Sequence, residues 1–387
     1  MSRSLNALGA LILGCCLAVL VAEGLLRIYN PFPFRVKGDE IVLPQFMNYR
    51  IEDVALPGLD PVVVHNKNSM GFRGPEWPAN ADKALTIFAV GGSTTECFYL
   101  SDGKDWPNVL GDELSRYFEN VWINNAGFDG HSTFGHIRLL EQFLLKRSPK
   151  VILFLVGGLD VNLEADNKQD RRFANSDVDL QSLRGFVTTL ALHSEIVSLA
   201  LNFYRYHKTI GQGFEHPLIP MPAQAPKGQF KPSLSEVERT KLLQRQNPYL
   251  VAYEERLKRL IELASSTGTL PVLITHPIIL GGTNATSSGT APRWDCIHFL
   301  QWGMKLDQDT VWRVQQAYND VTRSIAAMHK VPIVDMAELL PKSTDYFYDV
   351  VHFTNLGSRK VASIVLSTIC SVLAEKFPNH ANLNPCP

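Results

Sequence analysis

The sequence has almost no excess of charge of either sign. Lys and Arg number 37 against 38 Asp and Glu, so the formal net charge is -1 at pH 7. Proteins that bind nucleic acid usually carry a basic surface, and this balance provides no sign of one. We therefore expect no nucleic-acid partner. Internal repeats and low-complexity tracts are also absent, and a 387-residue chain with 45% hydrophobic residues is expected to fold.

Cysteine and histidine do not occur at metal-binding spacings. The six cysteines include no CxxC pair and no Cys/His cluster, and no Walker lysine follows the glycines at 91–92, so we expect no metal and no other cofactor. Cys97 is expected to be a small buried hydrophobic residue. In an oxidising compartment either Cys296 or Cys370 can pair with Cys386, and the sequence does not choose between them.

One long uncharged apolar run lies at the N-terminus. It covers 18 residues, 5–22, which is about the minimum for a transmembrane helix. We expect residues 1–29 to be a signal anchor that holds the remaining chain outside the cytoplasm, in the periplasm or the extracellular space. A lipobox-like sequence ends at Cys15, but the apolar run continues for seven more residues, which favours an uncleaved anchor over a lipoprotein.

The rest of the chain divides by its hydrophobic pattern. Residues 30–83 are rich in Pro, Asn and Gly, so we expect an irregular linker or collar. Residues 84–387 alternate short apolar runs with amphipathic stretches, which indicates an α/β domain with a parallel sheet covered on both faces. Insertions at 163–268 and 278–308 interrupt this alternation and are candidates for a lid. The expected strands are residues 84–90, 121–123, 151–156, 271–275 and 331–334. The expected helices are residues 106–118, 133–146, 180–206, 234–266, 309–329 and 356–376.

A serine directly follows the first expected strand, in the sequence Gly91-Gly92-Ser93-Thr94. Glycines let the chain turn sharply there and bring the hydroxyl to the carboxyl edge of the sheet, where α/β proteins gather functional groups. A lone serine in this position is more often a helix cap, and it becomes a nucleophile only when a base removes its proton. Asp349 and His352 are three residues apart near the C-terminus, so the carboxylate can orient the imidazole toward Ser93.

Four motifs in this order resemble the signature blocks of the SGNH/GDSL hydrolases. They are Gly-Gly-Ser at 91–93, Asn-Ala-Gly at 125–127, Gly-x-x-Asp at 157–160 and Asp-x-x-His at 349–352. The similarity runs from about residue 71 to residue 374, and Asn-Ser-Met-Gly-Phe-Arg at 68–73 is similar to the lead-in of membrane-anchored members. The resemblance implies a three-layer αβα, flavodoxin-like fold with five parallel strands, and an ester-bearing substrate.

The resemblance also implies a role for each matching residue. Ser93 would be the nucleophile, His352 the general base and acid, and Asp349 the carboxylate that orients the histidine. The backbone N–H groups of Ser93 and Gly127 would stabilise the oxyanion, with Gly158 in the same site.

The third block departs from the family pattern, because Leu159 stands where these hydrolases usually have an asparagine. Loss of such an oxyanion donor typically costs on the order of 100- to 1000-fold in rate. We expect Asn162 to substitute for it, and a turn or cap role is the alternative. His276 and His131 follow strands on the same edge, and each is expected to be structural, with substrate contact as the alternative.

The expected function is that of an extracytoplasmic serine esterase that hydrolyses or transfers O-acyl groups, chiefly O-acetyl groups, on a cell-envelope or exported glycan. A lipase or thioesterase is the alternative among enzymes. The competing class is a glycan-binding or polysaccharide-assembly protein that has lost turnover, which Leu159 supports and the retained Ser93, Asp349 and His352 oppose. The expected partners are an ester-bearing substrate, such as an acylated glycan, and a membrane that holds the N-terminal helix.

Overall fold

The computed structural model of the protein describes residues 2–32, 34–54, 56–162, 170, 183–209, 234–281 and 307–387. The chain forms two compact units, which are described separately. The smaller unit combines Met1–Pro44 with Phe173–Gly211, and the larger unit combines Gln45–Arg172 with Gln212–Pro387. A part of the first expected insertion and most of the second lie outside the described residues.

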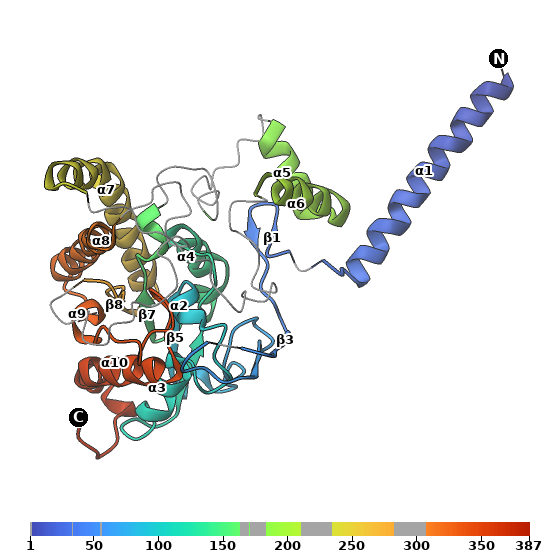
Figure 1. The fold of residues 1–387 in the computed structure, drawn as a ribbon. Coiled ribbons are helices and arrows are strands. Elements are labelled where there is room, and N and C mark those ends of the chain that lie inside the picture. Colours follow the sequence, from blue (N-terminus) through green and yellow to red (C-terminus); the bar gives the residue numbers. More distant parts are fainter. Residues whose placement is uncertain are drawn as a thin grey trace. The chain divides into compact units, whose positions relative to one another are not determined.

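The smaller unit begins with α1 (Ser2–Ile28), which Figure 1 shows as one continuous helix. Its segment Asn6–Ile28 has a mean hydropathy of 2.3 and no buried residues, so α1 is a candidate transmembrane helix. α10 (Asn355–Lys376) in the larger unit passes the same length and hydropathy test, but 56% of its apolar window is buried in the protein. α10 is therefore a core helix.

The last turn of α1 is joined to a pair of helices, α5 (Leu183–His193) and α6 (Glu195–Thr209). The Glu23 carboxylate accepts hydrogen bonds from the backbone N–H groups of Glu195 (3.0 Å) and Ile196 (3.1 Å) at the start of α6. The prediction of a single helix over residues 180–206 is wrong. The chain breaks at Ser194, whose hydroxyl accepts from the Val197 N–H (3.3 Å) and so begins a new helix.

The larger unit has the predicted α/β fold. Its sheet has five strands in the order β6-β5-β7-β8-β9, and all neighbouring strands are parallel. The strands are β5 (Leu85–Gly91), β6 (Val121–Asn125), β7 (Val151–Leu155), β8 (Leu270–Ile274) and β9 (Ile333–Val334). In chain order this is the 2-1-3-4-5 arrangement of flavodoxin-like folds, which switches direction between β5 and β7. The ends of these two strands are therefore the expected place for a site.

Helices cover both faces of the sheet, so its strands are buried (Figure 1). α3 (Trp106–Leu114) packs against α10 and β6 on one face. α7 (Glu236–Ser266) packs against β8, α4 (Thr133–Leu139) and α8 (Gln308–His329) on the other. The remaining elements of this layer arrangement are short. They are α2 (Ser93–Glu96), α9 (Met336–Leu339), the π-helix Leu140–Leu144, and the 3-10 turns Ala81–Lys83, Leu145–Arg147, Leu159–Asn162 and Pro378–His380.

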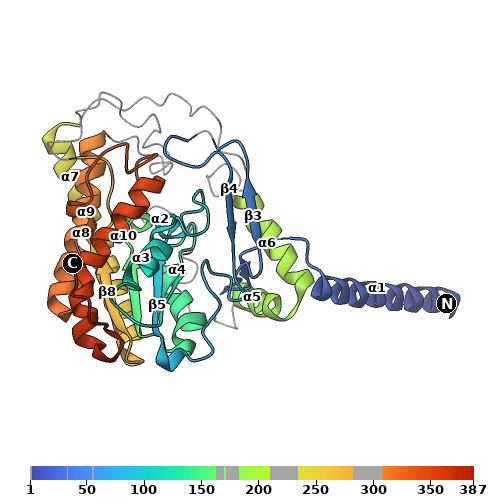
Figure 2. The ribbon, with the colours of Figure 1, turned by 90° about the horizontal axis from the view of Figure 1, so that it is seen from below.

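Two antiparallel strand pairs lie within residues 30–83, where the sequence predicts no regular structure. β1 (Val36–Lys37) pairs with β2 (Glu40–Ile41) in the smaller unit. β3 (Asn48–Ile51) pairs with β4 (Val63–Asn66) in the larger unit, and Figure 2 shows these two strands side by side. Strands of two to four residues are too short to leave a clear alternation in the sequence.

One disulfide ties the C-terminus to the core. It joins Cys370 in α10 to Cys386, with their Cα atoms 5.7 Å apart. Cys296, the other expected partner of Cys386, lies outside the described residues. Cys97 is an unpaired buried cysteine, as predicted.

Candidate active site

Ser93 is the first residue of α2, the one-turn helix that follows β5. Gly92 precedes it as the helix cap, and the Ser93 side chain is half-buried. The first N–H groups of a helix have no acceptor within the helix, so the Ser93 N–H points out of the turn. The residue thus presents a hydroxyl and a backbone donor at the point where the strand order switches direction.

Asp349 and His352 lie on the loop between α9 and α10 and meet Ser93 there. His352 Nε2 is 2.7 Å from Ser93 Oγ. His352 Nδ1 is 2.6 Å from Asp349 Oδ2, while Asp349 Oδ1 accepts the backbone N–H groups of Val351 (2.9 Å) and His352 (2.7 Å). Three hydrogen bonds therefore fix the carboxylate, and the carboxylate fixes the imidazole ring with one nitrogen toward the serine.

Charge and burial oppose each other in this pair. Burial alone would lower the pKa of His352, but the Asp349 charge and hydrogen bond outweigh burial and raise it above its ordinary value. Burial likewise would raise the pKa of Asp349, and the charge of His352 with the three hydrogen bonds lowers it. The pair is therefore arranged to stabilise an imidazolium next to Ser93, which is what a general base needs after taking a proton.

Tyr348 is a residue of this site that the motifs did not identify. Its ring stacks on His352 with the centroids 5.6 Å apart and the planes 11° from parallel. Tyr99 meets the edge of Tyr348 at 6.5 Å, so an aromatic surface covers one side of the histidine. The only signal in the sequence is the position of Tyr348 directly before Asp349, which gives no indication of stacking.

Gly127 packs tightly against α2. A Cβ atom on Gly127 would lie 2.2 Å from the backbone nitrogen of Glu96, so only glycine fits there. However, the Gly127 N–H donates to Asn125 Oδ1 at 2.9 Å. The group expected to stabilise an oxyanion is therefore already engaged in this structure.

Gly130, which no motif in the sequence marks, carries another backbone N–H in the same loop. It has a φ of 79°, which favours glycine, and no atom lies within 4 Å of where its Cβ would be. Among the residues that the structure describes, none accepts a hydrogen bond from its N–H. The carbonyl oxygen of the following residue, His131, lies 3.2 Å from a Cβ atom built on Gly92. The loop after β6 therefore comes close to the residue that precedes Ser93.

The loop after β7 reaches the same place from the other side of the switch point. Leu159 is half-buried, and its Cδ1 lies 3.5 Å from a Cβ built on Gly92. Asp160 is buried and holds the loop, since its Oδ1 accepts from Thr133 Oγ1 (2.5 Å) and from Arg256 Nη2 (3.1 Å). Asn162 ends the 3-10 turn, and its side chain lies outside the described part of the chain.

Gly158 and His276 pack directly on each other. A Cβ on Gly158 would lie 2.4 Å from His276 Nε2, so a larger residue does not fit. That nitrogen is 3.4 Å from Thr94 Oγ1, while Asn319 holds the His276 backbone at both its N–H (2.9 Å) and its carbonyl (3.1 Å). Burial, with a smaller effect from His352, lowers the pKa of His276 to about 3, so the ring stays neutral. These contacts suit a structural residue under the site.

His131 is buried, and its ring lies 4.3 Å from that of Phe128 in the loop after β6. Its contacts are those of a core histidine. Within the described ranges, no group of three His, Cys, Asp or Glu side chains is placed to bind a metal ion.

Comparison with known proteins gives a family match and distant structural similarities. A model of the GDSL-like lipase/acylhydrolase family matches residues 89–360. No curated protein matches the chain. The lipase/acylhydrolase from Enterococcus faecalis is similar in structure, at 12% identity and a TM-score of 0.41 over 78% of this chain and 100% of that one. The acetylxylan esterase Axe2 from Geobacillus stearothermophilus is also similar, at 14% identity and a TM-score of 0.41 over 74% of this chain and 94% of that one.

Proposed function

We propose that this chain, which belongs to the GDSL-like lipase/acylhydrolase family, is a membrane-anchored serine esterase with Ser93, His352 and Asp349 as its catalytic triad. The observation that carries the proposal is the continuous chain of hydrogen bonds from Asp349 through His352 to Ser93 Oγ. A serine without a base is a poor nucleophile, and this chain supplies both the base and the group that orients it.

In the proposed reaction, Ser93 Oγ attacks the carbonyl carbon of an ester while His352 Nε2 takes the hydroxyl proton. The tetrahedral intermediate then collapses, its bond to the alcohol oxygen breaks, and His352 returns the proton to the leaving alcohol. Water attacks the acyl-enzyme in the same way and releases the acid, and an acceptor hydroxyl in place of water gives acyl transfer. Asp349 stays ionised and stabilises the imidazolium in both steps.

The oxyanion is stabilised chiefly by backbone groups. Ser93 N–H is one donor, because it begins α2 with no acceptor in the helix. Gly130 N–H, which has no acceptor among the described residues, is our candidate for the second, and Gly127 N–H can contribute only if Asn125 releases it. The leucine at position 159 removes the usual side-chain donor, and Asn162 remains our candidate to replace it.

We further propose that α1 is a signal anchor and that the larger unit lies outside the cytoplasm. The apolar length of Asn6–Ile28 supports the anchor. The Cys370–Cys386 disulfide supports the location, because such bonds persist in the periplasm and outside the cell but are rare in the cytosol. A protein anchored there meets envelope and exported glycans, so we propose O-acyl groups on such a glycan, chiefly acetyl groups, as the substrate.

One observation favours a second function, that of a glycan-binding or assembly protein with little turnover. Leu159 places an apolar side chain beside Gly92, on the side of the site where an oxyanion would need a donor. Such a protein would keep the arrangement of the site and bind acylated glycan without cleaving it. The two functions differ in whether Ser93 forms an acyl-enzyme.

The deciding experiment uses the full-length protein in detergent micelles. We expect it to release acetate from p-nitrophenyl acetate and to be labelled covalently by a fluorophosphonate, and Ser93→Ala to abolish both. Ser115→Ala is a suitable control, because it removes a serine hydroxyl that donates to the Gly111 carbonyl at the end of α3, away from the triad. A folded wild-type protein that shows neither turnover nor labelling would leave only the binding function.

A further inference from the structure

Arg73 lies in the segment 68–73, upstream of the residues that the family model matches, and it is completely buried. Its backbone forms an antiparallel bridge with Asn125, at the carboxyl end of β6. The Arg73 N–H donates to the Asn125 carbonyl (3.1 Å), and the Asn125 N–H donates to the Arg73 carbonyl (2.8 Å). The segment therefore joins the carboxyl edge of the sheet as an additional short strand would.

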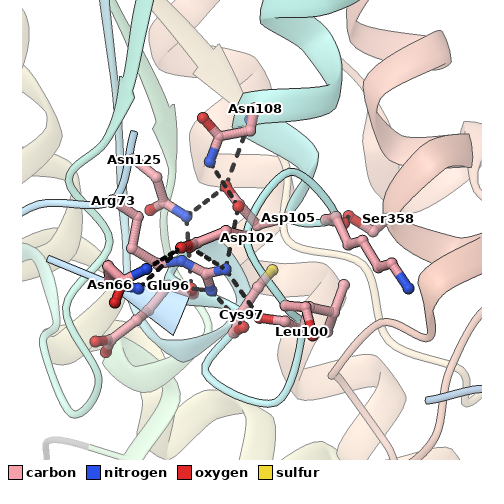
Figure 3. Close-up of polar contacts among 12 residues, drawn as sticks. Asn66, Arg73, Glu96, Cys97, Leu100, Asp102, Asp105, Asn108, Asn125 and Ser358 are labelled. Atoms are coloured by element: carbon pink, nitrogen blue, oxygen red, sulfur yellow. Dashed lines mark hydrogen bonds and ion pairs between the residues drawn. The ribbon is translucent and has the colours of Figure 1, made fainter. Parts of the chain in front are cut away.

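The guanidinium of Arg73 lies beside Glu96 and Cys97, at the carbonyl end of α2 (Figure 3). Nη1 donates to the carbonyl oxygens of Glu96 (2.9 Å) and Cys97 (2.7 Å), and Nη2 donates to that of Leu100 (2.8 Å). Nη2 is also 3.3 Å from the buried carboxylate of Asp105. A single side chain thus binds three carbonyls that end α2 and continue the turn after it.

Asn125 holds the same helix from the neighbouring strand, and Figure 3 shows its amide beside the guanidinium. Its Nδ2 donates to the Thr95 carbonyl (2.7 Å) and to Asp105 Oδ1 (2.9 Å). Its Oδ1 accepts the Gly127 N–H. Arg73 and Asn125 together, which we call the α2 brace, therefore occupy the carbonyls of three successive residues, Thr95, Glu96 and Cys97.

A helix as short as α2 needs such support. One turn fixes several backbone dihedrals for very few internal hydrogen bonds, so it is unstable by itself. Its last carbonyls have no partner within the helix and must be satisfied from outside, and a cation is favoured at this end of the helix dipole. Ser93 is at the opposite end of the same turn, so any shift of α2 moves the serine with it.

A second contact from the same segment fixes the side of α2 that faces the loop after β6. Lys67 and Glu96 form a buried ion pair (2.8 Å), and Glu96 Oε2 accepts the Asp129 N–H (2.5 Å). The residues just before Arg73 therefore tie α2 to the loop that contains Gly127 and Gly130. Residues 67–73 therefore contact α2 in two ways: Lys67 pairs with the Glu96 side chain, and Arg73 binds the Glu96 backbone carbonyl.

We propose that Arg73, acting with Asn125, is a positioning residue for the nucleophile, which sets the place of Ser93 relative to His352 through the carbonyls of α2. This inference rests on the proposed role of Ser93. It predicts that perturbing the brace lowers the rate of the chemical step more than substrate binding. A displacement of about 1 Å in a catalytic group can cost on the order of 100-fold in rate.

Arg73→Lys is the most informative variant. Lysine keeps the charge that faces Asp105, but its single ammonium cannot reproduce the planar fork that reaches three carbonyls. In full-length protein with p-nitrophenyl acetate we expect kcat to fall by about 100-fold, with KM little changed and fluorophosphonate labelling slowed by a similar factor. A crystal structure of the variant is expected to show the 2.7 Å contact between Ser93 Oγ and His352 Nε2 lengthened beyond hydrogen-bonding distance.

Arg239→Lys is the matched control. Arg239 is also buried, and it donates to Thr310 Oγ1 (3.0 Å) and to the Leu234 carbonyl (3.2 Å), at the start of α7 and α8. Its replacement should lower the melting temperature and leave kcat per folded molecule unchanged. Because Arg73→Lys can also destabilise the fold, activity is compared per folded molecule at temperatures well below each melting transition.

Asn125→Asp keeps the test decisive if Arg73→Lys does not fold. It removes the amide donor to the Thr95 and Glu96 carbonyls, while a carboxylate oxygen can still accept the Gly127 N–H and the guanidinium stays in place, so the same fall in kcat at constant KM is expected. The inference is overturned if the folded variant keeps wild-type kcat, if the loss appears in KM alone, or if Arg239→Lys produces the same fall. If the wild-type protein shows no esterase activity, the proposed function fails. The positioning role is tested separately, because an unchanged Ser93–His352 contact in the variant crystal structure would overturn it.

Discussion

Replacing Leu159 by asparagine should raise the esterase rate of the full-length protein, unless Asn162 already supplies the side-chain donor that Leu159 lacks. The side chain lies beside Gly92, next to the nucleophile, on the loop where these hydrolases usually supply a side-chain donor. An asparagine of nearly the same size placed there can donate to the oxyanion. One such donor is worth about 2.7–4 kcal/mol in the transition state, or 100- to 1000-fold in rate. We expect about 100-fold, the lower end of this range, because the residue is only half-buried and is less firmly held than a fully packed one.

The cost in stability should be small. Removing a fully buried leucine side chain typically costs roughly 2–5 kcal/mol, and a half-buried one loses less. A loss of about 1 kcal/mol would lower the melting temperature by about 2–4 °C in a domain of this size, which is easily separated from a change in rate. The variant should therefore be folded and more active.

The assay is steady-state hydrolysis of p-nitrophenyl acetate, with kcat and KM reported separately. Leu159→Ala is the control, since it loses the same apolar contact and gains no donor. We expect a higher kcat in Leu159→Asn alone, and Ser93→Ala should remove that gain. If Leu159→Asn is folded but no faster than wild type, a third donor does not limit the reaction, and our account of this position is refuted.

Three further predictions address the rest of the site and the fold. Asn162→Ala should lower kcat by about 100-fold if Asn162 supplies the missing donor, and unchanged kcat would rule out that role. Because His352 must be neutral to act as a base and its pKa is raised above the ordinary value, kcat/KM should rise with pH and level off only above this raised pKa; Asp349→Asn should move this limb to lower pH and reduce kcat by about 10,000-fold. Cys386→Ser opens a disulfide to Cys370, 16 residues away, and should lower the free energy of unfolding by about 3 kcal/mol in urea titrations.

The pH dependence of stability follows the same pair. The raised pKa of His352 stabilises the fold below its unfolded pKa, and this contribution is lost as the pH rises through the folded value. The lowered pKa of Asp349 stabilises the fold above its unfolded pKa, and this contribution is lost as the pH falls through the folded value. The pair therefore stabilises the fold most at pH values between the pKa of Asp349 and the pKa of His352. The esterase rate, in contrast, increases as the pH rises above the pKa of His352. Urea titrations at several pH values would measure the free energy of unfolding of the wild-type protein and of Asp349→Asn. If the stability of the wild type relative to the variant were lowest in this pH range, the pairing of Asp349 with His352 would be wrong.

The parts of the fold that were predicted correctly have strong local signals. Each strand of the sheet is a short apolar run that ends at glycine or another turn residue, so Leu85–Gly91 and Val151–Leu155 were located within a residue or two. The helix expected at 234–266 is also present, as Glu236–Ser266. Periodicity could not reveal the break at Ser194, because the apolar pattern continues through it and only a capping hydroxyl separates the two helices.

The contacts around Ser93 depend on distant segments, which explains why the motifs selected Ser93, Asp349 and His352, which lie together, but not the residues that surround them. Ser93, Asp349 and His352 were selected because residue type and spacing suit their chemistry. Arg73 and Lys67 were not, because a buried cation has no signature in the sequence until the carbonyls and carboxylate that it meets are known. Engagement of Gly127 by Asn125 was missed for the same reason, since neighbouring residues in a motif can be each other's partners.

The two halves of the proposed catalytic machinery differ in how completely they are formed. On the acid–base side, every polar atom needed for proton transfer is hydrogen-bonded, from Asp349 Oδ1 to Ser93 Oγ. On the oxyanion side, Gly127 N–H is engaged and position 159 carries an apolar group. Because the acid–base groups generate the nucleophile and the oxyanion donors lower the barrier to the tetrahedral intermediate, a deficit on the second side limits turnover more than it limits the ability of Ser93 to react. An activated acetate should therefore be a far better substrate than an unactivated ester, and the variants at position 159 should narrow that difference.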